Sequence, residues 1–231
     1  MKSTAVHRFR RKLQANEPVY GIWVTLDTVA ISEIATGLGF DWIVIDAASG
    51  HFDWAEVLEH IRATARSETV ALVRLAGASP ELIRRALDLG ADGVLVSGLE
   101  AADQLRSIVN QSSTNDKQES DTSALIGLVI NLERDQTKLR QMRSIEAVDF
   151  FFFNPQNSGA RGSGSVSAKQ GETLAEIRKH GKHAGIIAES DEALRGYLER
   201  EFRVLGIGPD AAIIRRGIQS TLEAVELATK S

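Results

Sequence analysis

Short and almost continuously apolar runs, rich in β-branched residues, recur eight times along the 231-residue chain. They lack the polar–apolar alternation of a strand with one solvent-facing side, and such runs are typical of parallel strands covered on both faces. Segments with helical spacing of apolar residues separate them, for example Ser79 to Leu89 and Asp191 to Phe202. The pattern predicts an α/β chain with strands at Tyr20 to Leu26, Trp42 to Asp46, Val70 to Arg74, Gly93 to Val96, Leu125 to Asn131, Phe150 to Asn154, Ala184 to Ala188 and Val204 to Gly208.

Eight alternating units predict a closed (β/α)8 barrel, the TIM-barrel architecture. The chain is 43% hydrophobic, which is enough for one large core, so we expect a single domain over residues 1–231. An open, doubly wound sheet is the alternative architecture for the same alternation.

Two segments depart from the repeating units. Residues 112–123 are entirely polar and have no periodicity, which predicts a loop. Residues 211–230 form a long helical pattern with an apolar side, which can pack on the chain's own barrel or on a neighbouring subunit.

Composition excludes several classes of function. The 27 basic and 31 acidic residues are mixed along the chain, so we expect no nucleic-acid partner. The chain contains no cysteine, which excludes disulfides, thiolate metal sites and a cysteine nucleophile. No apolar run approaches the roughly 20 residues that cross a bilayer, and the basic tail at residues 1–13 lacks the apolar stretch of a secretory signal. We therefore expect a cytoplasmic protein that does not interact with membranes.

In a (β/α)8 barrel the functional residues stand at the carboxyl ends of the strands, so the positions to inspect follow from the expected fold. Polar side chains are few there. They are Trp23, Thr25, Asp46, Ser49, His51, Arg74, Asn131, Glu133, Asn154, Gln156, Asn157, Glu189 and Asp210.

Arg74 ends an otherwise apolar run, where a buried guanidinium needs an acidic partner or an anionic ligand. It can hold a substrate carboxylate or a developing enolate oxygen, or form a structural ion pair with Asp46 or Glu133, and both roles can coexist. Glu133 can ligate Mg²⁺ or Mn²⁺, although it can equally be a helix N-terminal acid or a partner of Arg74. His51 can act as an acid or base near neutral pH, but a loop histidine can also be merely solvated.

Ordered blocks of sequence carry a family resemblance over nearly the whole chain. They are Gly21 to Leu26, Gly39 to Asp46, Val73-Arg74, Leu87 to Val96 and, more faintly, Gly206 to Asp210. In these blocks the chain resembles the HpcH/HpaI aldolases, which are (β/α)8 barrels.

The resemblance implies a class II, metal-dependent aldolase, in which a divalent ion polarises pyruvate and stabilises the enolate that adds to an aldehyde. Arg74 matches the substrate arginine of the family, and Trp23 accompanies it as a substrate-binding residue. Glu133 matches the first metal carboxylate, and Asp46 matches the aspartate that orients the catalytic histidine. Because members of the family assemble through their C-terminal helices, we also expect a homo-oligomer.

The departures from the family fall on the chemistry itself. Ser49 occupies the position of the histidine base, and a serine hydroxyl cannot take that proton at neutral pH without a base of its own. Asn157 replaces the second metal carboxylate and should weaken metal binding, because an amide oxygen carries no charge. Ser97 stands where the family has a proline after the fourth strand, and residues 112–123 replace a Tyr-Pro-Pro and Arg-Gly stretch.

Two hypotheses of function follow. In the first, the chain is a divergent carbon–carbon lyase that acts on a pyruvate-like 2-oxo acid, with a weakened Mg²⁺ or Mn²⁺ site at Glu133 and Asn157. His51 or a water then replaces the lost base. In the second, the metal site and the catalysis are lost, and the barrel is a non-catalytic ligand-binding or scaffolding subunit.

Overall fold

The computed structural model describes residues 2–49, 52–98, 123–130, 148–153 and 168–230. Eight parallel strands pair in sequence order, and β1 pairs with β8 to close the barrel. This confirms the (β/α)8 fold and excludes the open sheet. The strands are β1 (Val19–Val24), β2 (Trp42–Asp46), β3 (Val70–Ala76), β4 (Gly93–Ser97), β5 (Leu125–Ile130), β6 (Phe150–Phe153), β7 (His183–Ile187) and β8 (Val204–Pro209).

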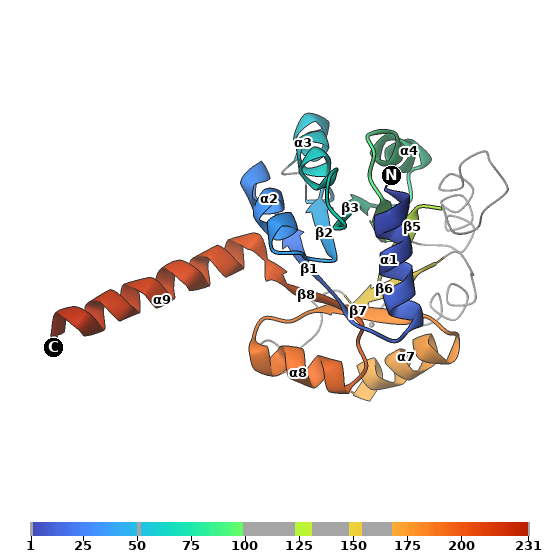
Figure 1. Cartoon of the computed structure of the whole chain (residues 1–231). Helices are drawn as coiled ribbons and strands as arrows, with labels where there is room; N and C mark the ends of the chain where they lie inside the picture. The colour runs from blue at the N-terminus through green and yellow to red at the C-terminus, as the bar shows by residue number, and fades with distance from the viewer. Residues whose placement is uncertain (1, 50–51, 99–122, 131–147, 154–167, 231) are drawn as a thin grey trace.

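Helices surround the barrel and lie across one end of it (Figure 1). Those described are α1 (Ser3–Gln14), α2 (Val29–Gly37), α3 (Trp54–Thr64), α4 (Pro80–Asp88), α7 (Ala168–Lys179), α8 (Asp191–Glu199) and α9 (Asp210–Lys230). Side-chain caps define several helix starts. The Ser79 hydroxyl accepts from the Leu82 amide before α4, and Asp53 and Glu56 form a capping box at α3.

The inside of the barrel is filled by alternate residues of the strands, while the residues between them face the outer helices. Trp42, Phe150 and Phe152 are among the interior residues and are almost fully buried. Glycines stand opposite the large rings: a β-carbon at Gly21 would overlap the Trp42 ring, and one at Gly185 would overlap Phe152. The described part of the interior is therefore a packed core, as is typical of barrels whose ligands bind at the mouth.

The N-terminal segment is not the basic tail expected from the sequence, because it forms α1, which lies across the amino ends of the strands. Its apolar residues Ala5, Val6, Phe9 and Leu13 are buried. Its cations reach aspartates that precede the even strands. Lys12 Nζ lies 2.7 Å from Asp41 Oδ1, Lys2 Nζ lies 3.4 Å from Asp92 Oδ2, and Arg10 Nε lies 2.7 Å from Asp149 Oδ1.

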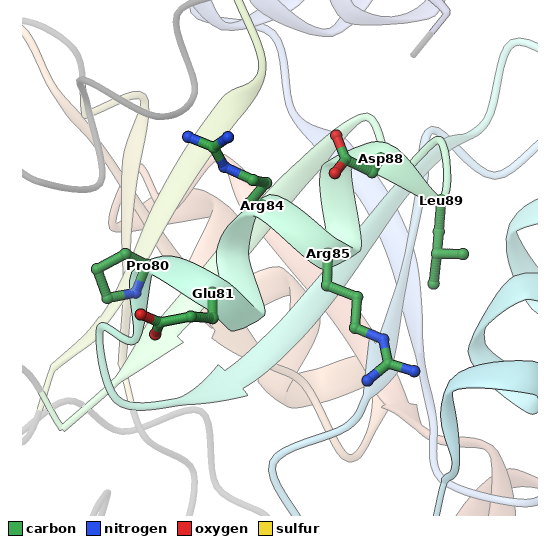
Figure 2. A pocket seen from close by; sticks show the side chains of 6 residues that line it. All are labelled: Pro80, Glu81, Arg84, Arg85, Asp88 and Leu89. Atoms are coloured by element: carbon green, nitrogen blue, oxygen red, sulfur yellow. The ribbon is translucent and has the colours of Figure 1, made fainter.

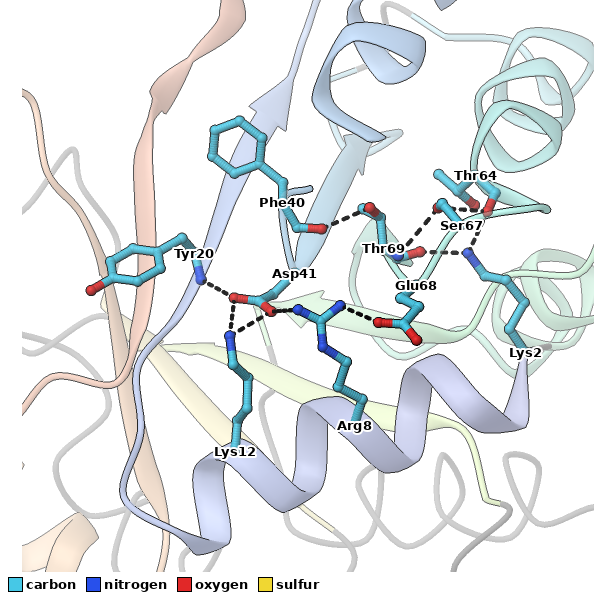
Figure 3. Close-up of polar contacts among 10 residues, drawn as sticks. All are labelled: Lys2, Arg8, Lys12, Tyr20, Phe40, Asp41, Thr64, Ser67, Glu68 and Thr69. Carbon is cyan, nitrogen blue, oxygen red and sulfur yellow. Dashed lines mark hydrogen bonds and ion pairs between the residues drawn. The ribbon is translucent and has the colours of Figure 1, made fainter. Parts of the chain in front are cut away.

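The same three aspartates also fix the strands to one another. Each accepts from a backbone amide of the preceding strand, Tyr20 for Asp41, Ala71 for Asp92 and Ile126 for Asp149, at 2.8–3.0 Å. Figure 3 shows Asp41 between Lys12, Arg8 and the Tyr20 amide, and the Lys2 ammonium donating to the carbonyl of Thr64, 2.8 Å away, and to that of Thr69. Shared ion pairs and hydrogen bonds thus close this end of the barrel.

The last helix, α9, runs away from the barrel (Figure 1). It is attached at its start, where the buried Asp210 carboxylate accepts from the Thr25 hydroxyl at 2.6 Å and from the amides of Thr25, Leu26 and Ala211. Beyond its first turn α9 is exposed, including Ile218, Leu222 and Val225. Among the described helices, none is long and apolar enough to cross a membrane.

Candidate functional site

The carboxyl ends of β1 to β4 bring four polar or aromatic side chains together at the mouth of the barrel. The alternation along each strand explains why they face inward: Val44, Leu72 and Leu95 belong to the interior core, and the residues two positions later are Asp46, Arg74 and Ser97. Asp46 and Arg74 are register partners of β2 and β3. Trp23 approaches the same place from β1.

Asp46 is buried, and its carboxylate accepts hydrogen bonds from two side chains and two backbone amides. Arg74 Nη1 donates to both of its oxygens at 2.7 and 2.8 Å, and Trp23 Nε1 donates to Oδ2 at 2.8 Å. The amides of Ala48 and Ser49 approach Oδ1 at 3.2 and 3.3 Å. A carboxylate with this many donors is poorly suited to act as a base, so its role here is to hold Arg74 and the turn that follows β2.

Arg74 is held on several sides. Besides the Nη1 contacts with Asp46, its Nε donates to Ser97 Oγ at 3.1 Å, and its Cζ lies 5.6 Å from the centroid of the Trp23 ring. Its side chain keeps 23% of its surface exposed, and no described residue accepts from Nη2. Arg74 therefore combines a fixed guanidinium with one open edge, as an anion site requires.

The two roles expected for Arg74 from the sequence, a structural ion pair and an anion site, are therefore compatible in this structure. Among the described residues, the acidic partner of Arg74 in this ion pair is Asp46. Because the two charges compensate each other, an anion at the mouth would be held mainly by directed hydrogen bonds.

Of the remaining residues expected in the site, the structure describes some and not others. Ser49 lies exposed in the turn after β2, and its hydroxyl donates to the Asp46 carbonyl at 3.3 Å, with no base among its described neighbours. His51, Glu133 and Asn157 lie outside the described residues, as do Asn131, Asn154 and Gln156. Within the described ranges, no three His, Asp or Glu side chains gather to hold a metal ion. The carboxylates of Asp46 and Asp210 already accept from the protein, so the described part of the mouth does not itself fit a metal ion.

A buried histidine lies away from the barrel interior, between α2 and α3. His60 Nδ1 is 2.8 Å from Ser32 Oγ, and both side chains are almost fully buried. The Phe52 ring packs edge-on against His60 with the centroids 5.2 Å apart. Burial lowers the pKa of His60, although the charges of Asp27 and Asp210 oppose this shift. The buried pair joins two helices and does not belong to the cluster around Arg74.

A shallow hollow of about 530 Å³ lies on the outer surface of α4, between Pro80 and Leu89 (Figure 2). Arg84 and Asp88 line it, and Arg85 stacks on Trp54 with its Cζ 4.8 Å from the ring centroid. Its residues come from one helix and do not join the cluster around Arg74, so it is not part of the candidate site.

Comparison with known proteins identifies the family that shares this barrel. A sequence model described as HpcH/HpaI aldolase/citrate lyase matches residues 19–216. The chain belongs to the HpcH/HpaI family. Membership in this family of aldolases and lyases confirms the resemblance found in the sequence, and the matched range contains Trp23, Asp46, Arg74 and Ser97.

Individual HpcH/HpaI relatives are distant but align over most of their length. The chain is 26% identical to a 4-hydroxy-2-oxovalerate aldolase of Novosphingobium aromaticivorans, over 93% of this chain and 92% of the relative. It is also 26% identical to a hydroxypyruvate/pyruvate aldolase of Pseudomonas aeruginosa, over 93% and 91%. The crystal structure of an HpcH/HpaI aldolase/citrate lyase family protein from Burkholderia cenocepacia J2315 superposes with a TM-score of 0.83 at 21% identity, covering 95% of this chain and 99% of that one. This last likeness supports the fold.

Ser97 is the residue at the mouth of this HpcH/HpaI barrel that the sequence analysis did not identify as part of the site. The sequence marked it only as the replacement of a proline. The alternation along β4 carried the necessary signal, because Ser97 is two residues beyond the interior Leu95.

Proposed function

We propose that the chain is a divergent carbon–carbon lyase that acts on a 2-oxo acid such as pyruvate. The observation that supports this proposal most strongly is the open edge of Arg74, fixed by Asp46, Ser97 and Trp23 at the mouth of a barrel of this family. A guanidinium held in this way suits a small planar anion. The alignment with 2-oxo acid aldolases over most of the chain agrees with this substrate class.

In the proposed reaction, Arg74 binds and orients the acid. Asp46 keeps the guanidinium in place, and the Trp23 ring, which packs on Phe152 at 5.3 Å between centroids, forms an apolar wall beside it. The C3 proton of the 2-oxo acid passes to His51 or to a water, the electron pair of the broken C3–H bond forms the C2–C3 double bond, and the π pair of the C2 carbonyl moves onto its oxygen. The enolate carbon then forms a bond to the aldehyde carbon, the π electron pair of the aldehyde carbonyl moves onto its oxygen, and that oxygen takes up the proton that was removed from C3.

Glu133 and Asn157 are the proposed ligands of a divalent ion, Mg²⁺ or Mn²⁺. When bound, such an ion would supply Lewis-acid stabilisation of the enolate oxygen. The loss of charge at Asn157 leads us to propose a weak metal site.

Proton exchange at C3 of pyruvate tests this function without knowledge of the aldehyde. We expect the protein, with Mn²⁺ or Mg²⁺, to exchange these protons for deuterium, followed by NMR, and Arg74→Ala to lower the rate at least about tenfold. Arg84→Ala, on the outer face of α4, is the matched control and should leave the rate unchanged. Calorimetric titration of each ion, with and without pyruvate, measures the metal site separately.

The second candidate is a non-catalytic barrel that binds a ligand or scaffolds a partner. It is favoured by Ser49, an exposed hydroxyl with no base among its described neighbours at the position of the family's histidine. Binding of pyruvate without exchange, and without turnover of any pair of a 2-oxo acid and an aldehyde, would establish this alternative over the lyase.

We further propose that the chain acts in the cytoplasm as a single domain and as a homo-oligomer, with small carboxylates as its ligands and without nucleic acid or membranes. The exposed apolar residues of α9 support the oligomer, because most of the stability of a helix in a protein comes from packing its apolar side.

A further inference from the structure

We infer that Ser97 and Arg74 together form a two-donor clasp for one carboxylate oxygen, an inference that rests on the proposed function and specifies how that site binds its substrate. The clasp consists of the Ser97 Oγ–H and one Nη2–H of Arg74. The short contact that brings them together is the 3.1 Å hydrogen bond from Arg74 Nε to Ser97 Oγ.

The shape of the guanidinium group brings the two donors side by side. The Nε–H bond and one Nη2–H bond point in parallel along one edge of the planar group. Because Ser97 Oγ accepts at Nε, it lies on that edge, next to the space that Nη2 faces. The other Nη nitrogen, Nη1, is turned toward Asp46 and does not face this space.

The hydroxyl of Ser97 has a proton to donate there. A serine oxygen can accept one hydrogen bond and donate another, and here the accepted proton comes from Arg74. The Ser97 side chain is half-buried, and no described residue accepts from its hydroxyl. A ligand oxygen that accepts from Nη2 is therefore within reach of both the charged N–H and the hydroxyl.

The backbone holds Ser97 firmly in this position. Ser97 pairs with Ala76 in the β3–β4 register, and its carbonyl accepts from the Gly77 amide at 2.8 Å. Gly77 and Gly98, which directly follow the two strands, both have positive φ, 93° and 70°, a conformation that glycine adopts without steric strain. The clasp is thus preorganised, which lowers the cost of ordering it on binding.

The ligand that fits is a carboxylate that directs a single oxygen into the clasp. Ser97 occupies the Nε–H, and Asp46 occupies Nη1, so the usual two-pronged Arg–carboxylate pair is blocked on both edges of the group. The hydroxyl replaces the missing second donor. Its removal should therefore weaken binding, although removal also frees the Nε–H.

Carboxylate binding by the intact protein tests the clasp without the proposed reaction. We expect Ser97→Ala to raise the Kd for pyruvate about tenfold, measured by ligand-observed NMR titration without added metal, since a hydrogen bond to a charged group contributes about that factor. Ser97→Thr keeps the hydroxyl on a β-branched residue suited to a strand and should retain most of the affinity. Ser67→Ala is the matched control, because that hydroxyl donates to the Thr64 carbonyl at the opposite end of the barrel.

Methyl pyruvate is the probe for the carboxylate itself. It lacks the charge, so it should bind the wild type more weakly than pyruvate does, and Ser97→Ala should not change its affinity. Equal binding of ester and acid, with the same dependence on Ser97, would refute the carboxylate assignment. A Kd for pyruvate that is unchanged or lower in Ser97→Ala, or no pyruvate binding by the wild type, would overturn the clasp.

These outcomes are separable from those of the proposed function. Binding that depends on Ser97 without C3 proton exchange would support the clasp and reject the lyase. C3 proton exchange that depends on Arg74 but not on Ser97, together with an unchanged pyruvate affinity of Ser97→Ala, would support the lyase and reject the clasp.

Discussion

At the scale of single residues, the environment of Asp46 determines what it can do. Its carboxylate receives Arg74, Trp23 and two backbone amides, so it is an anchor for the guanidinium rather than a free base. Removal of its charge should affect both stability and binding, since the Arg74 side chain is largely buried.

Asp46→Asn tests this dual role. The amide of asparagine cannot accept at both positions, so Arg74 loses its charge partner and its fixed orientation. We expect unfolding to become easier by about 2 kcal/mol and the Kd for pyruvate to rise at least about tenfold, measured by urea denaturation and NMR titration. Glu59→Gln removes an exposed ion pair with Arg62 and should change neither the free energy of unfolding nor the Kd by a comparable amount. If Asp46→Asn leaves both quantities unchanged, Asp46 does not hold Arg74 in place.

The sequence could place part of the candidate site. Arg74 and Asp46 were predictable as neighbours, because a charged residue at the end of a buried parallel strand needs a partner on an adjacent strand. Ser97 was missed because a small hydroxyl residue after a strand has no distinctive pattern until the inward side of β4 is known. The roles of His51, Glu133 and Asn157 remain predictions, since these residues lie outside the described ranges.

At the scale of secondary-structure elements, burial on both faces made the strands easy to recognise. Continuous apolar runs located all eight, and no strand end differs from the expected one by more than two residues. Helix α1 was missed because its five basic or histidine residues hide the apolar side formed by Ala5, Val6, Phe9 and Leu13. Only the aspartates at the amino ends of β2, β4 and β6 reveal why those cations are there.

Helix α9 carries a prediction about assembly. Ile214, Ile218, Leu222 and Val225 share one side of the helix and are 39–66% exposed. We expect the wild type to form an oligomer in light scattering, and Ile218→Glu to shift it toward smaller species, because a charge would be buried in the contact.

Ser220→Glu adds the same charge on the opposite side of α9 and should leave the oligomer intact. A wild type that is monomeric at all working concentrations, or an equal effect of the two substitutions, would contradict this role for the apolar side of α9.

At the scale of the whole molecule, the buried His60 and the half-buried His183 link stability to pH. Burial is the largest cause that lowers the pKa of both His60 and His183 from the ordinary value of 6.5. The unfolded chain therefore takes up protons at a higher pH than the folded barrel does. Stability should be fully present above about pH 6.5 and should fall as the pH drops toward the lowered folded-state values.

Thermal unfolding between pH 7.5 and 5.5 measures this dependence. The Tm should decrease on acidification, and His60→Gln should make the decrease shallower, because one of the two groups no longer titrates. His180→Gln is the control, since that residue follows α7 and makes a local contact with the Glu176 carbonyl. A Tm that stays constant or rises on acidification would contradict the linkage.

The position of α1 has a consequence for how the chain assembles during its synthesis. Arg10 and its partner Asp149 are 139 residues apart, so α1 can complete its ion pairs only after the start of the sixth strand has been made. Until then the amino ends of the early strands lack their cover. Helix α1 therefore precedes all eight strands in sequence but reaches its final contacts only after the sixth strand has begun.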